Sequence, residues 1–151
     1  MKPRKGDIIE ISVKDGFAYA LFTHKVKLDG ELIRVWSDVH ERRPSSFDAI
    51  VHSDPSFSCF FPLDRSVSRS LVSIVGHADI PGPLAAFPTF RNGLVGPDRR
   101  VSTWWLWDGV DEWKIGDLTE AQRNFPIRGT WTFVLLQLRI EEKWNPRDAD
   151  F

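Results

Sequence analysis

The chain has 151 residues, of which 42% are hydrophobic and 27% are charged, the composition of an ordinary globular domain. Its formal net charge is −1, so the total charge provides no strong attraction to nucleic acid or to an anionic membrane. No apolar run approaches the roughly 20 residues of a membrane-spanning helix, and the basic start is not followed by the apolar core of a signal peptide. We expect a soluble, cytoplasmic protein whose residues 1–151 form a single domain, with no membrane or nucleic-acid partner.

Three segments at the start of the chain predict a meander of antiparallel strands. Residues 8–13 are rich in β-branched side chains and alternate apolar with polar positions, and residues 17–24 and 32–38 read as the next two strands. Lys14-Asp15-Gly16 and Leu28-Asp29-Gly30-Glu31 supply the turns between them. Three strands joined by tight turns indicate a meander that curls into a small barrel, and the start Lys5-Gly6-Asp7-Ile8-Ile9 resembles the opening of SH3-like barrels.

The segment that follows is polar and interrupted by proline. In residues 40–57, Ser46 is a plausible cap for a short turn through residues 47–51. Residues 57–63 are apolar and predict a buried strand. This strand contains Cys59, the only cysteine, so the chain forms no internal disulfide. A buried, unreactive thiol is a better interpretation of Cys59 than a catalytic nucleophile.

The centre of the chain predicts further strands separated by a stretch without regular structure. Residues 67–75 alternate weakly and read as a strand. Residues 76–97 contain so many Gly and Pro residues that we expect no regular element there, although their apolar side chains should pack on the domain. Residues 101–107 form a strand with two apolar faces, which is typical of a strand that is central in its sheet or lies under an interface, and we expect residues 113–115 to pair back onto it.

The last third of the chain contains the clearest helical signal. Thr119 and Gln122 have the spacing of a capping box, so we expect a short helix there. Residues 131–140 form a continuous apolar run and predict the last strand, and residues 141–151 form a polar C-terminal tail. The expected fold is mainly β, an N-terminal SH3-like β-meander or barrel elaborated by further antiparallel strands, with one or two short helices.

Motifs for catalysis or for a bound cofactor do not stand out in the sequence. The four histidines lack the spacing of a zinc site, and no glycine-rich phosphate loop or nucleophile elbow occurs. Asp108, Asp111 and Glu112 cluster in one turn, but their spacing does not match a calcium-binding loop. We therefore predict no enzyme activity, no metal and no cofactor, while a hydrolase or transferase with an unrecognised site and RNA binding by the basic start remain as alternatives.

Tryptophans are concentrated in one stretch of the chain. Such side chains can stack on sugar rings, or they can fill a core, and a strand with two apolar faces is usually buried. We favour the core, and we keep a small-ligand or carbohydrate-binding β module that uses a Trp-rich surface as the alternative function. The tryptophans concerned are Trp104, Trp105, Trp107 and Trp113.

Several segments follow one another in a distinctive order along residues 5–145. They are Lys5-Gly6-Asp7-Ile8, Asp15-Gly16-Phe17-Ala18-Tyr19-Ala20, Val75-Gly76, Phe87-Pro88-Thr89-Phe90-Arg91-Asn92-Gly93, Trp105-Leu106-Trp107-Asp108-Gly109, Leu118-Thr119-Glu120-Ala121-Gln122-Arg123-Asn124-Phe125-Pro126-Ile127 and Leu138-Arg139-Ile140. This ordered set resembles the immunity protein 26 family of bacterial polymorphic toxin systems. The chain departs from the family pattern at residues 40–57.

The resemblance implies a cytoplasmic protein that protects its cell by binding and occluding a cognate toxin. It implies no catalytic residues, and the sequence leaves the oligomeric state open. If the toxin is basic, an acidic surface would speed association, whereas the alternative is a solvated loop with no role in binding. Arg91, in the loop of residues 88–93, is a second candidate contact, whose alternative is a packed structural turn. The candidate acidic contacts are Asp108, Asp111, Glu112, Asp117 and Glu120.

Overall fold

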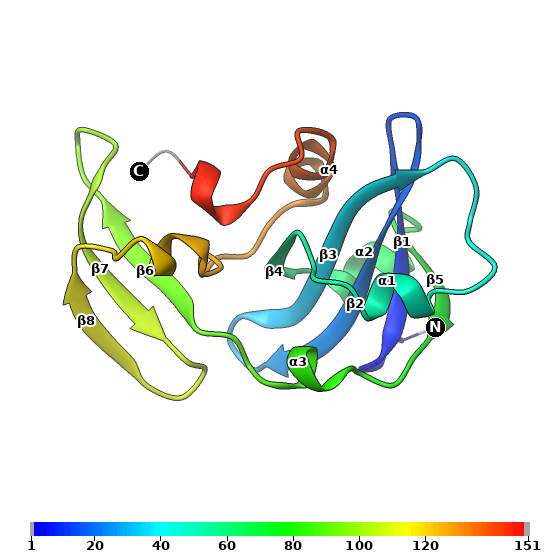
Figure 1. Ribbon diagram of the computed structural model, residues 1–151, viewed down its shortest axis with the longest axis horizontal. Helices are drawn as coiled ribbons and strands as arrows, with labels where there is room; N and C mark the ends of the chain where they lie inside the picture. Colours follow the sequence, from blue (N-terminus) through cyan, green and yellow to red (C-terminus); the bar gives the residue numbers. More distant parts are fainter. Residues whose placement is uncertain (1, 150–151) are drawn as a thin grey trace. The chain divides into compact units, whose positions relative to one another are not determined.

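The structure of the protein is a computed structural model that describes residues 2–149. In this part of the chain, eight strands form two antiparallel sheets, accompanied by four short α-helices and two 3₁₀ helices (Figure 1). The prediction of a mainly β fold is therefore confirmed. The chain divides into two compact units, Met1–Ala86 with Gly129–Trp144 and Phe87–Arg128 with Asn145–Phe151. The single domain expected from the sequence stays a prediction.

The first unit is built on a five-stranded sheet with the order β4-β3-β2-β1-β5. The meander predicted at the start of the chain is confirmed, because its first three strands pair in sequence. β4 and β5 lie at opposite edges and do not pair with each other among the described residues, so the sheet does not close into a barrel. The strands are β1 (Asp7–Val13), β2 (Gly16–Val26), β3 (Gly30–His40), β4 (Phe57–Phe61) and β5 (Ser73–His77).

The turn between β1 and β2 has the backbone geometry that the sequence Lys14-Asp15-Gly16 predicts. Asp15 and Gly16 both have positive φ, 72° and 151°, a conformation that Asp tolerates and Gly adopts freely. A Cβ atom at Gly16 would also lie 2.1 Å from the carbonyl oxygen of His40. Only glycine fits this position, so the local sequence fixes the hairpin and its register.

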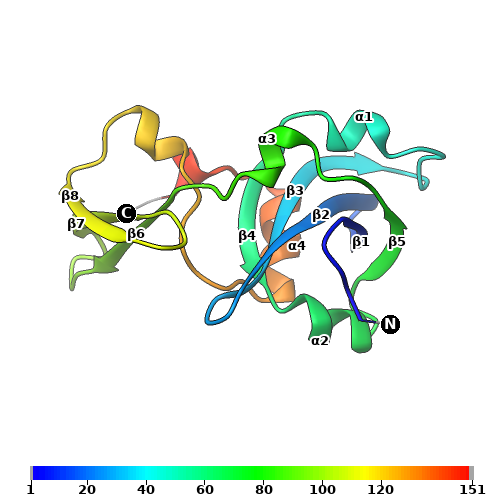
Figure 2. The ribbon, with the colours of Figure 1, turned by 90° about the horizontal axis from the view of Figure 1, so that it is seen from below.

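Side chains cover both faces of this sheet. On one face, Tyr19 and Leu21 pack with Val51 of α1 (Asp48–Val51) and Leu84 of α3 (Gly82–Ala85). On the other face lies α4 (Phe133–Glu141), coloured orange in Figure 2, which contacts β1 and β3. Residues 18–23 of β2 are buried without interruption, as expected for a strand that is covered on both faces.

The strand predicted at residues 131–140 is wrong, because this segment forms α4. The Thr132 hydroxyl accepts a hydrogen bond from the Leu135 N–H at 3.1 Å and so caps the helix. Leu136 and Ile140, four residues apart, are completely buried, while Val134 and Leu138 are exposed. A continuous apolar run does not distinguish a buried strand from a short helix, and here the packing surface of the sheet favours the helix.

Two further predictions in the middle of the chain are corrected. The strand expected at residues 67–75 is replaced by α2 (Leu63–Ser68) and the later strand β5, with Ser70 at φ 59° in the turn between them. Residues 76–97 contain regular elements, α3 and the strand β6, because Pro83 lies in the first turn of a helix, where no N–H donor is needed. The strand predicted at residues 57–63 is confirmed as β4, and Cys59 is completely buried in it.

The second unit contains a three-stranded antiparallel sheet in the order β6-β7-β8. Of the two positions that the sequence left open for residues 101–107, the structure shows the central one. The capping box is also present: the Thr119 N–H donates to Gln122 Oε1 at 2.8 Å, and the Gln122 N–H donates to the Thr119 hydroxyl at 3.3 Å. The elements are β6 (Phe90–Val95), β7 (Val101–Trp107), β8 (Glu112–Gly116), and the 3₁₀ helices η1 (Ala121–Asn124) and η2 (Pro146–Asp148).

The polar segment from residue 141 onward is held in place as far as the structure describes it. Trp144 is 7% exposed, and its ring centroid lies 5.7 Å from that of Phe57 and 5.2 Å from that of Trp131. Asn145 and Asp148 then form a capping box around η2. None of the helices in the described residues has the length and apolar character needed to cross a membrane.

Candidate binding surfaces

Two exposed tryptophans of the second unit lie on opposite faces of its sheet. Trp105 is 40% exposed and precedes Leu106, so the two side chains point to opposite faces. Trp113 is 41% exposed and stands directly opposite Leu106 in the β7–β8 pairing, so it shares the face of Leu106. The two exposed indole rings therefore cannot form one flat stacking platform, and Trp104 and Trp107 are buried. The expectation that these four tryptophans fill a core is confirmed for Trp104 and Trp107 and is wrong for Trp105 and Trp113.

Each buried tryptophan of this strand lies under an arginine. The Arg91 guanidinium carbon is 4.9 Å from the Trp104 ring centroid, and that of Arg128 is 3.7 Å from the Trp107 centroid. Cation–π contacts of this kind stabilise a fold most when the cation is removed from water. The second unit thus uses arginine on indole as a repeated packing element.

Arg91, one of the predicted contacts, points into the second unit and is 3% exposed. Its guanidinium donates hydrogen bonds to the carbonyl oxygens of Phe125 at 3.3 Å and Arg123 at 3.4 Å, and to that of Pro146. Burial, together with the nearby charge of Arg123, lowers the pKa of Arg91. This placement agrees with the structural alternative and leaves Arg91 out of reach of a partner.

Asp108 shapes the turn between β7 and β8. Its Oδ1 accepts hydrogen bonds from the N–H groups of Val110 at 2.9 Å and Asp111 at 2.8 Å. The hydrogen bonds from Asp111 and Val110 lower the pKa of the Asp108 carboxyl, which keeps it charged. Asp111 is exposed, and neither aspartate forms an ion pair with another described residue.

The other predicted acidic contacts differ in how far their charge is balanced. Glu112 lies 3.2 Å from Arg128 and accepts a hydrogen bond from Asn92 at 3.3 Å. Glu120 pairs with Arg147, whose hydrogen bond and charge lower the pKa of the Glu120 carboxyl. Asp117 lines a cavity of about 180 Å³ and has no ion-pair partner among the described residues. The predicted acidic surface therefore reduces to three uncompensated carboxylates, Asp108 and Asp111 before β8 and Asp117 after it.

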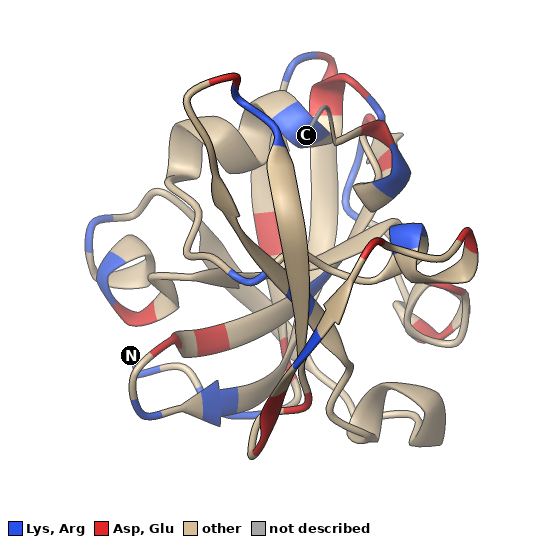
Figure 3. Cartoon of the chain, turned by 90° about the vertical axis from the view of Figure 1, so that its left-hand side faces the viewer, with Lys and Arg blue, Asp and Glu red and all other residues tan. Residues whose placement is uncertain are grey.

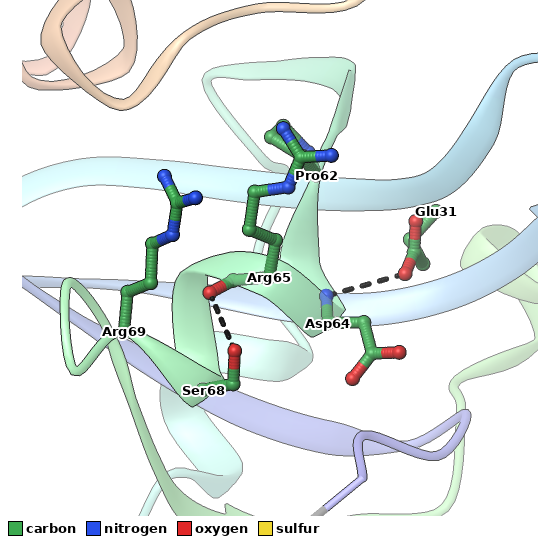
Figure 4. Close-up of a pocket in the computed structure, with 6 residues that line it drawn as sticks. All are labelled: Glu31, Pro62, Asp64, Arg65, Ser68 and Arg69. Atoms are coloured by element: carbon green, nitrogen blue, oxygen red, sulfur yellow. Dashed lines mark hydrogen bonds between the residues drawn. The ribbon is translucent and has the colours of Figure 1, made fainter.

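Figure 3 shows that charged residues of both signs gather at turns and strand ends of the molecule. One hollow of the first unit has charged residues of both signs along it. It is an open groove of about 590 Å³ beside α2, which the sequence did not reveal (Figure 4). Arg65 and Arg69 extend side by side on one side of it, and Glu31 accepts a hydrogen bond from the Asp64 N–H at 3.2 Å on the other. The mixed charge suits a polar or ionic contact, but it defines no single ligand.

Two of the four histidines meet at a cavity, although the sequence gave no indication of it. His52 and His77 line a space of about 310 Å³ together with Asp48 and Asp79. His77 Nδ1 lies 2.9 Å from Oδ1 of Asp7, a buried carboxylate 70 positions away in the sequence. A carboxylate held in this way orients an imidazole, which is the arrangement of a general base. Among the described residues, no three His, Cys, Asp or Glu side chains are grouped as metal ligands.

No protein-family model, no curated protein and no solved structure matches the chain.

Proposed function

We propose that this chain is an immunity protein that binds a cognate bacterial toxin directly in the cytoplasm of the producing cell and occludes it. The proposal begins from the ordered segments that resemble the immunity protein 26 family. It needs a surface suited to tight protein binding, and the second unit supplies the best candidate.

The observation that carries the proposal is the exposed indole of Trp113 between uncompensated carboxylates at the two ends of β8. Trp113 is 41% exposed, and tryptophan is among the residues most often found at the centre of a binding interface. Asp108, Asp111 and Asp117 add negative charge at the two ends of the same strand. An aromatic anchor with charge around it combines affinity with fast association.

The sign of this charge favours a basic partner. Asp108 keeps its charge because two backbone N–H groups hydrogen-bond to it, so the surface stays negative across the physiological pH range. Toxins that act on nucleic acid are commonly basic, and an acidic inhibitor would associate with them at a rate that falls as salt increases.

The test is co-expression with the product of a neighbouring toxin gene, followed by co-purification and growth measurement. We expect the chain to restore growth and to form a complex with the toxin. The double variant Asp111→Lys and Asp117→Lys should bind the toxin at least tenfold more slowly at low salt. The double variant Asp38→Lys and Asp54→Lys in the first unit is the matched control, because it makes the same charge change at exposed sites outside this surface. Absence of both complex and rescue would refute the proposal.

The alternative of a carbohydrate-binding module is weakened by the positions of the tryptophans. Stacking on a sugar chain needs several exposed rings on one face, whereas Trp105 and Trp113 lie on opposite faces. We therefore keep protein binding as the proposed function.

A further inference from the structure

The outer edge of β8 presents unpaired backbone groups. β8 is the last strand in the order β6-β7-β8 and lies at the edge of the sheet in Figure 1. Within the described part of the chain, its backbone bonds to β7 and to no other segment. The opposite edge is different, since the β6 residue Arg91 exchanges backbone hydrogen bonds with Pro126 and Arg128 at 2.8 and 2.9 Å. The β6 edge is thus covered at Arg91, whereas the β8 edge is open along the whole strand among these residues.

The hydrogen-bond pattern of the hairpin identifies which groups point outward. The Asp108 N–H donates to the Asp111 carbonyl oxygen at 3.1 Å, so these two residues form a hydrogen-bonded pair. Hydrogen-bonded and non-hydrogen-bonded pairs alternate along an antiparallel ladder, and Leu106 opposite Trp113 is therefore the next hydrogen-bonded pair. Glu112 and Lys114, which belong to the intervening pairs, consequently direct their N–H and C=O groups away from β7.

The surroundings of this edge select the kind of segment that would pair with it. Uncompensated carboxylates stand at both ends of the strand, Asp108 and Asp111 before it and Asp117 after it. The exposed Trp113 ring has no arginine over it among the described residues, in contrast to Trp104 and Trp107. An added strand with Lys or Arg side chains would bring cations to the carboxylates and to the free indole face.

We propose that the β8 edge binds an extended, basic segment of a partner protein by strand addition. This inference rests on the proposed function only in taking that partner to be the toxin. The segment pairs with the outward N–H and C=O groups of Glu112 and Lys114, about 4.8 Å from β8. A Lys or Arg side chain of the segment lies over Trp113.

The short length of the edge disfavours a second copy of this chain as the occupant. Two β8 strands paired antiparallel about Trp113 would place Glu112 of each copy opposite Lys114 of the other, an attractive contact that occurs twice because the pairing is symmetric. A five-residue edge nevertheless buries much less than the roughly 1,600 Å² of a standard stable interface, so it does not hold a stable dimer.

The first experiment uses a defined probe and does not depend on the toxin. The ¹⁵N-labelled full chain is titrated with an acetylated peptide of about six residues that alternates lysine and valine, and with the same peptide carrying glutamate in place of lysine. We expect amide shifts concentrated in Glu112–Gly116 for the basic peptide and none for the acidic one. Shifts confined to other segments, or no shifts, would overturn the inference. Self-association that increases with protein concentration and broadens β8 would also overturn it, since the occupant would then be a second copy.

The second experiment removes one outward donor. Lys114→Pro eliminates an N–H that points away from β7, which an edge strand tolerates, whereas Lys114→Ala removes the same side chain and keeps the N–H. We expect Lys114→Pro to weaken peptide and toxin binding about tenfold relative to Lys114→Ala, because one backbone hydrogen bond is lost. The far-ultraviolet circular dichroism and melting temperature of both variants establish that they remain folded.

The outcomes separate this inference from the proposed function. If the toxin binds the wild-type chain and both Lys114 variants equally well, the edge inference fails and toxin binding stands. If no toxin binds but the basic peptide still pairs with β8, the proposed function fails and the edge remains a docking site for a basic segment.

Discussion

Replacing Arg91 tests whether this residue supports the fold or contacts a partner. In Arg91→Ala, the carbonyl oxygens of Phe125, Arg123 and Pro146 lose their donor, and Trp104 loses the cation above its ring. Hydrogen bonds from a charged donor contribute about 1.5–3 kcal/mol, although the two at 3.3 and 3.4 Å are long. A partly desolvated cation–π contact adds about 0.5–2 kcal/mol.

Taken together, these contributions give an expected loss of about 3 kcal/mol in the stability of the second unit. The assay is denaturant unfolding followed through the indole N–H signals in NMR spectra. Four of the seven tryptophans belong to the second unit and three to the first. We expect the second-unit signals to disappear at lower denaturant concentration, while the first-unit signals keep their midpoint. Arg91→Lys keeps the positive charge but lacks the planar guanidinium group, so it should recover part of the lost stability.

Arg123→Ala is the matched control, because Arg123 is exposed and its ion pair with Glu120, at 3.7 Å, lies in water. Surface pairs of this kind contribute about 0–1 kcal/mol, so this variant should unfold much like the wild type. A loss below about 1 kcal/mol in Arg91→Ala, accompanied by weaker toxin binding, would refute the structural role and restore Arg91 as a contact.

Two more predictions concern the first unit. Trp144→Ala should lower the unfolding free energy of the first unit by about 3–5 kcal/mol, because it removes a 7% exposed indole that packs on Phe57 and Trp131. Chemical denaturation measures this loss, and a loss below about 1 kcal/mol would contradict the packing. Complete burial raises the pKa of the Cys59 thiol above its ordinary value of 9.0, so the folded state keeps the proton that the unfolded chain releases. Stability should therefore fall as pH rises above about 9, Cys59→Ala should lack this part of the slope, and rapid reaction of the native thiol with a thiol reagent would contradict the burial.

Predictions from the sequence were correct wherever a few neighbouring residues determine the backbone conformation. The β1–β2 hairpin follows from Asp15 and Gly16, which adopt positive φ readily, and the turn at η1 follows from the reciprocal bonds of Thr119 and Gln122. The alternating residues of β1 likewise predicted a strand, because alternation matches the period of its pleat.

Predictions failed where a segment's environment decided its conformation. Residues 131–140 are apolar enough for a central strand, but they form α4, whose Leu136 and Ile140 fill one face of the first sheet. The same limit applies to the candidate contacts. The sequence offered both Arg91 and Asp108 as candidate contacts with a partner. The structure shows that Arg91 is buried over Trp104, whereas Asp108 remains at the surface.

By itself, the sequence determined the β class, the hairpins and the position of the acidic, tryptophan-rich segment, because these depend on residues that are near one another in the chain. The tertiary structure decided which tryptophans are covered, which carboxylates are paired with arginine and which strand edge stays open. These properties depend on partners far apart in the sequence, such as Glu120 with Arg147 and Asp7 with His77. Charge compensation and burial are set by distance in space, so only the folded chain defines which charged and aromatic groups remain exposed.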